Sequence, residues 1–183
     1  MGVFKINKNR FINGVFNISR ISISLLLLGI ILFMGGCSSS VKSTPQDKNI
    51  TAIKTVLEHQ FTGPNEEFIE GLDNIPKLEQ YYEKRYKSYF TEDMYNRFIV
   101  AHAYDYLLMA HNNGKQIKVD TVSVKSIEST EGTYTYKVVV LYGKEGSNQE
   151  SAEVSGRAKF SKDGKIASIK YLDDGGLSEE LRN

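Results

Sequence analysis

Hydrophobic residues follow three kinds of pattern along the chain. From Ile21 to Cys37 they form one uncharged run, ISISLLLLGIILFMGGC. Between residues 49 and 113 they recur at spacings of three and four, which is typical of amphipathic helices, and from Gln116 onward they alternate with polar residues, as in strands with one buried face. The order predicts an N-terminal targeting segment followed by an α+β domain.

The helical part predicts three short helices before a longer one. The first carries its apolar face at Ile50, Ile53, Leu57 and Phe61 and ends at Gly63-Pro64. The second follows the N-cap Asn65 and runs from Glu66 to Leu72. The third opens near Pro76 and gathers four tyrosines on one side, which we interpret as a core edge with hydroxyls that reach water: Tyr81, Tyr82, Tyr86 and Tyr89.

The fourth helix is the longest, with Thr91 as its predicted N-cap and its end near Asn113-Gly114. At 100° per residue one stripe contains Met94, Phe98, Ala101, Leu108 and Met109. Asp105 falls within that stripe, with His102 one turn before it. A buried carboxylate requires a partner, and two interpretations stay open: a pocket acid paired with His102, or, as we favour, a structural hydrogen bond to Tyr134, Tyr136 or Arg97.

The alternating part predicts four antiparallel strands. The first runs from Gln116 to Ser129, and its apolar register slips between Val119 and Val122, which indicates a bulge. The second runs from Thr133 to Tyr142 with Tyr134, Tyr136, Val138, Val140 and Tyr142 on one face. The third faces inward with Ala152, Val154, Gly156, Ala158 and Phe160. Asp163-Gly164 predicts a tight hairpin into the last strand, Lys165 to Leu172, after which a short tail is expected.

The apolar run near the N-terminus predicts a secretory signal. Residues 1–20 contain four basic residues and no acidic one. The helix from Ile21 to Gly36 would span about 24 Å, short of the roughly 30 Å hydrocarbon core, which favours a cleaved signal over the alternative of an uncleaved anchor. The sequence Met34-Gly35-Gly36-Cys37 resembles the bacterial lipobox, although Met34 stands where that family usually has Leu.

The lipobox resemblance implies a specific processing route. A diacylglyceryl group would join the sulfur of Cys37, cleavage would follow Gly36, and the new amino group could accept a further acyl chain such as palmitate. The predicted organisation is a signal peptide at 1–36, a lipidated flexible tether at 37–48, rich in Ser, Thr and Pro, and a domain at 49–183. The expected location is the extracytoplasmic face of the cell membrane.

Removal of the predicted signal peptide reverses the sign of the net charge. Removing residues 1–36 leaves 147 of the 183 residues and lowers Lys plus Arg from 23 to 19 against 22 Asp plus Glu. The mature chain is therefore acidic, and we expect no nucleic-acid partner. Cys37 is the only cysteine, so the domain is expected to fold without a disulfide.

The order of elements resembles the NTF2-like family, also called cystatin-like. The segment Tyr89-Phe90-Thr91-Glu92-Asp93-Met94-Tyr95 is similar to the entry of the long helix in small bacterial lipoproteins with this domain. The resemblance covers about residues 49–173. It implies a curved sheet that wraps one long helix into a cone, whose interior can be an enzyme pocket, a ligand pocket or a plain scaffold.

Function has to come from the residues, because a fold of this kind hosts many functions. Three scattered histidines and one cysteine make a metal site improbable, and no cofactor motif is present. We therefore predict a non-enzymatic lipoprotein that binds a protein partner, and the resemblance extends to components of conjugation machinery and its exclusion factors. The alternative is an apolar-ligand site in the cone, or a SnoaL or ketosteroid-isomerase type of enzyme, with Asp105, His102, Tyr134 and Tyr136 as the candidate pocket.

Overall fold

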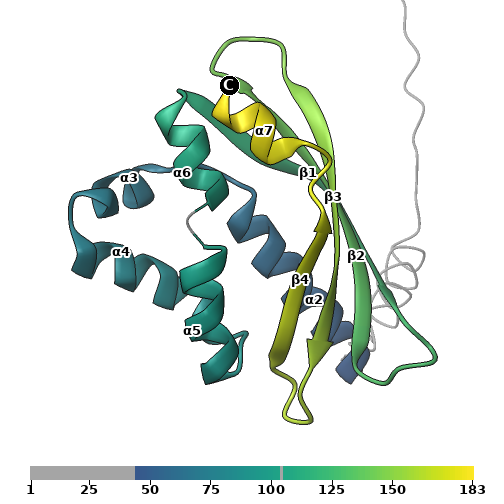
Figure 1. Ribbon diagram of the computed structural model, residues 1–183. Coiled ribbons are helices and arrows are strands. Elements are labelled where there is room, and N and C mark those ends of the chain that lie inside the picture. Colours follow the sequence, from purple (N-terminus) through teal and green to yellow (C-terminus); the bar gives the residue numbers. More distant parts are fainter. Residues whose placement is uncertain (1–43, 104) are drawn as a thin grey trace, which may run out of the picture. The chain divides into compact units, whose positions relative to one another are not determined.

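A four-stranded antiparallel sheet forms the second half of the domain, and helices from the first half cover one of its faces (Figure 1). The computed structural model describes residues 44–103 and 105–183. The predicted α+β class, with helices followed by four antiparallel strands, is confirmed. Within the described ranges, no helix combines the length and apolar character needed to cross a bilayer. The run from Ile21 to Cys37 lies outside these ranges.

The first helix, α2 (Pro45–Gln60), begins earlier than its apolar spacing predicts. Thr44 Oγ1 accepts a hydrogen bond from the Asp47 N–H at 3.2 Å, and the Asp47 carboxylate accepts one from the Thr44 N–H at 3.0 Å. Pro45 suits the first helical position, where an N–H is not required. The predicted flexible tether is therefore wrong for residues 45–48, which form the first turn of α2, and residues 37–43 lie outside the described part.

Two short helices and a π-helical turn follow the cis peptide bond at Gly63-Pro64. The side chain of Asn65 caps α3 (Glu66–Leu72), and that of Asn74 caps α4 (Ile75–Tyr82), each by accepting a backbone N–H bond three residues on. The π-helical turn η1 (Glu83–Lys87) continues α4. The predicted cap and bounds of α3 are confirmed.

Three tyrosines of this segment lie inside the core rather than at its edge. Tyr81, Tyr82 and Tyr86 are buried together with their hydroxyl oxygens. The ring of Tyr86 lies 5.0 Å from the ring of Phe98 on the next helix. The prediction that these hydroxyls reach water is wrong, because α2 and α5 pack over η1. Tyr89 is half-buried.

The predicted long helix is two helices, α5 (Glu92–Ala101) and α6 (Asp105–Asn112). Thr91 caps α5 as predicted, since its Oγ1 accepts a 3.4 Å bond from the Met94 N–H. At its end the N–H groups of His102 and Ala103 both bond to the Phe98 carbonyl, at 2.9 and 3.1 Å, and the buried Gln60 side chain donates a 3.0 Å bond to the His102 carbonyl. The predicted stripe does not continue across this break.

The strands β1 (Lys115–Ser126), β2 (Thr133–Lys144), β3 (Glu150–Phe160) and β4 (Ile166–Asp173) pair in chain order. The register between β1 and β2 shifts at Asp120, which confirms the predicted bulge. The extra residue matters, because it returns Val122 and Val124 to the face that carries Ile117. Both predicted inward rows, from Tyr134 to Tyr142 and from Ala152 to Phe160, are buried.

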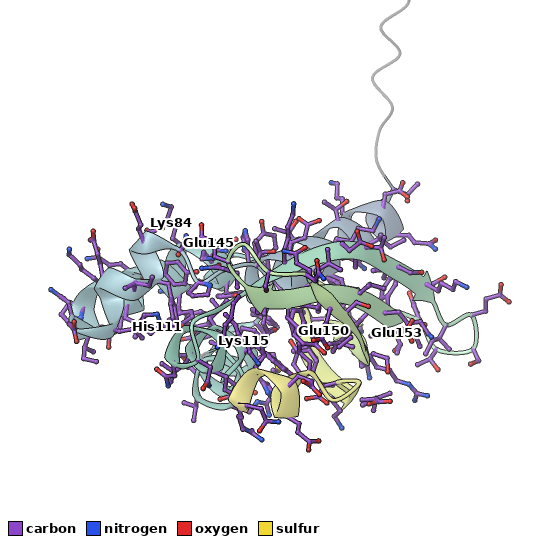
Figure 2. The ribbon with its side chains drawn as sticks, turned by 90° about the horizontal axis from the view of Figure 1, so that it is seen from above. Lys84, His111, Lys115, Glu145, Glu150 and Glu153 are labelled. Carbon is purple, nitrogen blue, oxygen red and sulfur yellow. The ribbon has the colours of Figure 1, made fainter. Side chains whose placement is uncertain are left out.

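The predicted C-terminal tail is a short helix, α7 (Leu177–Arg182). Leu177 and Leu181 are fully buried, and α7 packs on α6 and β3. The Asn113 side-chain amide donates a 2.9 Å bond to the Leu181 carbonyl, and the Lys115 ammonium donates to the carbonyl of Glu180. Figure 2 shows Lys115 beside this helix. The tail therefore closes one end of the core.

Candidate functional site

The residues predicted to line a pocket do not converge. Asp105 is exposed in the first turn of α6, because the helix break removes it from the buried stripe. Tyr134 is buried, and its hydroxyl accepts a 3.1 Å bond from the Asn49 side chain. The Tyr136 hydroxyl donates to the Lys170 carbonyl at 3.0 Å. The proposed hydrogen bond from Asp105 to either tyrosine is thus wrong.

Arg97, the other partner considered for Asp105, pairs instead with Asp93 at 2.8 Å. His102 is half-buried beside the ring of Tyr171, at 5.2 Å between centroids. Burial lowers the pKa of His102, and the charge of Asp105 opposes that shift. His102 and Asp105 therefore interact electrostatically without forming a buried acid–base pair. Cys37 lies outside the described residues.

Tyr171 on β4 is the polar centre of the interior. Its hydroxyl donates to the side-chain oxygen of buried Gln60, and the rings of Phe61 and Tyr136 each lie 6.1 Å from its ring. Burial raises the pKa of both Tyr136 and Tyr171 well above the ordinary value for tyrosine, so their hydroxyls stay neutral donors. These contacts fill the interior between helices and sheet with side chains. Gln60 is a polar residue within the apolar stripe of α2, three residues after Leu57, which is a sequence signal for a buried polar contact, whereas Tyr171 follows the alternation of β4 and gives none.

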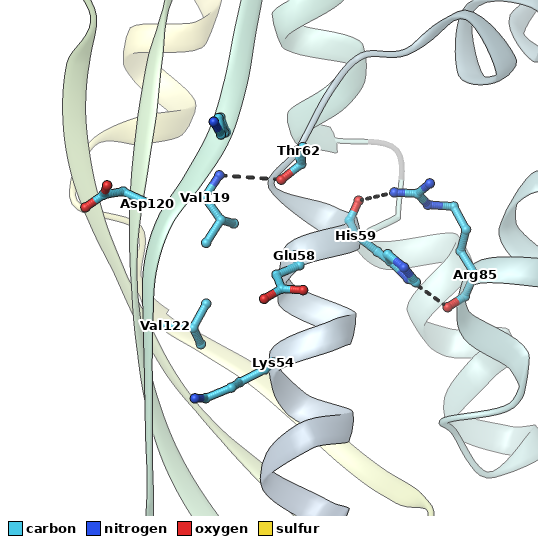
Figure 3. Close-up of a pocket in the computed structure, with 9 residues that line it drawn as sticks. Lys54, Glu58, His59, Thr62, Arg85, Val119, Asp120 and Val122 are labelled. Atoms are coloured by element: carbon cyan, nitrogen blue, oxygen red, sulfur yellow. Dashed lines mark hydrogen bonds between the residues drawn. The ribbon is translucent and has the colours of Figure 1, made fainter. Parts of the chain in front are cut away.

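A groove between α2 and β1 is the strongest candidate for a binding site (Figure 3). It encloses about 460 Å³, and Val119 and Val122 of β1 form its apolar side. Lys54 and Glu58 stand one turn apart on α2 and point across it toward β1, whereas Asp120 points away on the other side of the strand (Figure 3). Lys118 and Thr62 complete the walls near the end of α2.

Along the groove, the backbone of β1 is only partly paired on its outer edge. The Ile117 N–H and C=O bond to Gly63 at 2.8 and 3.0 Å, so the peptide groups of Ile117 point away from β2. Along an antiparallel strand the peptide groups of successive residues point alternately toward and away from the paired strand. The register gives Val122 and Val124 the same orientation as Ile117, away from β2. The structure gives their edge-facing backbone groups no partner in residues 44–103 and 105–183.

His59 and Arg85 close the groove on the far side of α2 (Figure 3). The Nδ1–H of His59 donates to the Arg85 carbonyl at 3.0 Å, and the Arg85 guanidinium donates to the His59 carbonyl at 3.3 Å. That guanidinium also lies 4.8 Å above the ring of Tyr81. Burial, and then the charge of Arg85, lower the pKa of His59. This pair joins η1 to α2 and holds a positive charge at the rim.

The groove carries groups that can bind a polypeptide. It offers an apolar strip, side chains of both charges and open backbone groups, which are the features that bind an extended polypeptide. No group of three or more His, Cys, Asp or Glu side chains in the described part of the chain is placed to hold a metal ion. The bulge was the only sequence signal for the groove, because it marks an irregular edge.

No protein-family model matches this chain, and no curated protein sequence matches it, so these residues are themselves the basis for a functional proposal.

Proposed function

We propose that this protein is a bacterial lipoprotein, anchored through Cys37 at the extracytoplasmic face of the membrane. Its domain is NTF2-like and binds an extended segment of a partner protein in the groove between α2 and β1, without catalysing a reaction. The single observation that carries this proposal is the open edge of β1 beside the groove. An added strand would satisfy the backbone groups of Val122 and Val124 and cover the valine side chains.

The packing of the interior supports a protein-binding function over the alternative of an apolar-ligand or isomerase-type pocket. A pocket of that kind requires open space with convergent polar groups. Here Phe61, Tyr136 and Tyr171 occupy the space under the helices, and the hydroxyls of Tyr136 and Tyr171 are already committed to Lys170 and Gln60.

Two features support the NTF2-like assignment. The strands form a simple antiparallel meander after the helices, and bulges in β1 and β4 are the irregularities that bend such a sheet. The break between α5 and α6 is a departure from the single long helix that the resemblance implies.

The binding proposal is tested with a photo-crosslinking amino acid at position 54, whose side chain points into the groove (Figure 3). The matched control places it at Lys77, which is exposed on α4. We expect in cells a discrete adduct from position 54 and none from position 77. Val122→Pro removes an edge N–H without removing a bond to β2 and should abolish the adduct.

Circular dichroism of Val122→Pro checks that the fold is kept. If the fold is lost, Glu58→Lys, which reverses the charge of a side chain that lines the groove, is used as the disrupting variant instead. Equal adducts from positions 54 and 77, or an adduct unaffected by these substitutions, would overturn the proposal.

Anchoring is tested separately by metabolic labelling with a fatty acid. Because the thiol is the acyl acceptor, Cys37→Ala should carry no label and should stay at precursor size. Equal labelling of both proteins would reject the lipobox interpretation while leaving the groove experiment intact.

A further inference from the structure

The outer face of the sheet, which no helix of residues 44–103 and 105–183 covers, carries a row of positive charge. We define the cationic row as Lys125, Arg157 and Lys170. The register places Lys125 opposite Thr135, Thr135 opposite Arg157 and Arg157 opposite Lys170, so the row crosses all four strands. All three cations are exposed, and none has an ion pair within the described residues.

This arrangement is unfavourable for folding alone. Like charges directly opposite one another on a sheet destabilise the pair, and Arg157 faces Lys170 across β3 and β4. Two carboxylates border the row but are engaged elsewhere. Glu153 pairs with Lys137 at 2.6 Å, and Asp173 accepts a 2.9 Å bond from the Gly175 N–H. An external anion would relieve the repulsion within the row.

The row borders a shallow hollow of about 340 Å³ on the same face. Lys125, Lys137 and Arg157 line it together with the hydroxyl-bearing residues Ser123, Thr135 and Ser155, and no carboxylate is among the lining residues. Cations and hydroxyl donors without acceptors are the groups that bind phosphate oxygens. Leu172 also lines the hollow, and 61% of its surface is exposed.

The start of the described chain lies at the same end of the sheet. The Gln46 side chain on α2 donates a 3.2 Å bond to the Ser126 hydroxyl, next to Lys125. The described chain therefore begins on the helix-covered side of β1, at the strand end that carries Lys125 on its outer side.

We propose that the outer face of the sheet docks on the anionic phospholipid surface of the membrane to which the chain is anchored. The cationic row contacts the headgroup phosphates, and Leu172 enters the interfacial region. This inference rests on the proposed lipid anchor. Basic residues near an anionic bilayer each contribute about 1 kcal/mol, and an exposed apolar side chain adds to that attraction. Docking would fix the orientation of the domain on the membrane. It would therefore also fix the side from which a partner reaches the α2–β1 groove.

The test uses the full lipidated chain in nanodiscs that contain either phosphatidylcholine alone or phosphatidylcholine with about a third phosphatidylglycerol. An environment-sensitive dye is attached to Leu172→Cys, which is the only free thiol once Cys37 carries lipid. The control attaches it to Val100→Cys on α5, where Val100 is 86% exposed. We expect a blue shift only for position 172, only with phosphatidylglycerol, and its loss in 0.5 M salt.

Replacing Lys125, Arg157 and Lys170 with Gln should reduce the docked-to-free ratio about a hundredfold, since three contributions of this size are removed. The control replaces Lys77, Lys84 and Lys87 with Gln, which changes the net charge equally on the helical side, and should leave the ratio unchanged. A blue shift that is equal in both kinds of nanodisc, or equal for both triple variants, would overturn the proposal.

Two further outcomes separate the possible causes of failure. A response of the position-172 dye to inorganic phosphate without nanodiscs would indicate a soluble phosphate site and overturn the membrane assignment. Failure of the chain to float with the nanodiscs would show that the lipid anchor is wrong. A chain that floats without a dye response would reject docking alone.

Discussion

The two faces of the sheet differ in what their residues do for the protein. On the inner face every position from Tyr134 to Tyr142 that points to the helices is buried, and each hydroxyl on Tyr134 and Tyr136 has a partner. On the outer face Lys137 pairs with Glu153, whereas Arg157 lies opposite Lys170 and neither has an ion pair within the described residues. The inner face holds the fold together, whereas the outer face and the groove at β1 keep groups available for partners. Stability therefore comes from the inner face, whereas recognition is proposed for the outer face and for the open edge of β1.

The largest effect is expected at Gly156, on the inner face of β3. A Cβ there would lie 2.2 Å from the Lys170 carbonyl oxygen and 2.3 Å from the Tyr136 hydroxyl oxygen. The first of these atoms is backbone and cannot move aside alone. Gly156→Ala should therefore lower the free energy of unfolding by about 3 kcal/mol, the upper range for overpacking.

The matched control is its outer-face neighbour, Ser155→Ala, which should change the free energy of unfolding by less than about 0.5 kcal/mol. Urea denaturation of both variants measures the contrast. Similar losses in the two variants would contradict the division between the faces.

Buried hydroxyls give the next largest effect and sharpen the comparison within the core. Tyr171→Phe removes the donor to Gln60 and leaves a buried oxygen without a partner, which should cost about 1–3 kcal/mol. The Tyr81 hydroxyl is buried without a hydrogen-bond partner in the described part of the chain. Tyr81→Phe should therefore be neutral or slightly stabilising. Thermal and urea unfolding measure the change in the free energy of unfolding for each variant. The two changes should differ in sign or clearly in size.

Local signals in the sequence predicted much of this fold. The caps at Asn65 and Thr91, the bulge after Val119 and the inward row of β2 follow from the chemistry of single residues or from a period of two. Such features depend on neighbours in the sequence, so no tertiary information was needed for them.

Several of the failures share one physical cause, which is a partner distant in the chain. The end of α5 is stabilised by Gln60, 42 residues earlier, and projecting one helical wheel across that break placed Asp105 in the core. The tyrosine hydroxyls are buried where α3 packs against α4 and where α2 and α5 pack against η1. The edge of β1 became a candidate site only when its pairing with Gly63 showed which backbone groups remain open. The spacing of Leu177 and Leu181 was a local signal for α7 that we did not use.

A smaller effect is expected from pH. Burial is the main cause of the lowered pKa values of His59 and His102 relative to the ordinary value of 6.5. Below pH 6.5 the unfolded chain therefore binds protons at these positions that the folded chain does not, and the folded state loses stability as the pH falls. Above pH 6.5 neither state is protonated there, and the contribution is constant.

The measurement is the thermal midpoint between pH 8 and pH 5. His59→Asn keeps a side-chain donor for the Arg85 carbonyl and removes the titrating ring, so its midpoint should fall less steeply over the same range. An equal slope in the variant would assign the pH dependence to other groups.

The smallest effect is expected at Asp105, which the break between α5 and α6 places on the surface. If α5 and α6 were one helix, Asp105 would be buried and Asp105→Asn would cost about 1–3 kcal/mol through a lost charged hydrogen bond. In the structure Asp105 is exposed in the first turn of α6, where its charge gains only about 0.3 kcal/mol from the helix dipole. Asp105→Asn should therefore change the free energy of unfolding by less than about 0.5 kcal/mol. Asp174→Asn is the matched control, because Oδ1 and Oδ2 of Asp174 accept N–H bonds from Gly176 and Ser178 at 3.1 and 3.2 Å ahead of α7. The Asn amide keeps only one acceptor oxygen, so the lost hydrogen bond should cost about 1 kcal/mol. A larger loss for Asp105→Asn than for Asp174→Asn in the same urea titration would place the carboxylate of Asp105 inside the core and restore the single long helix.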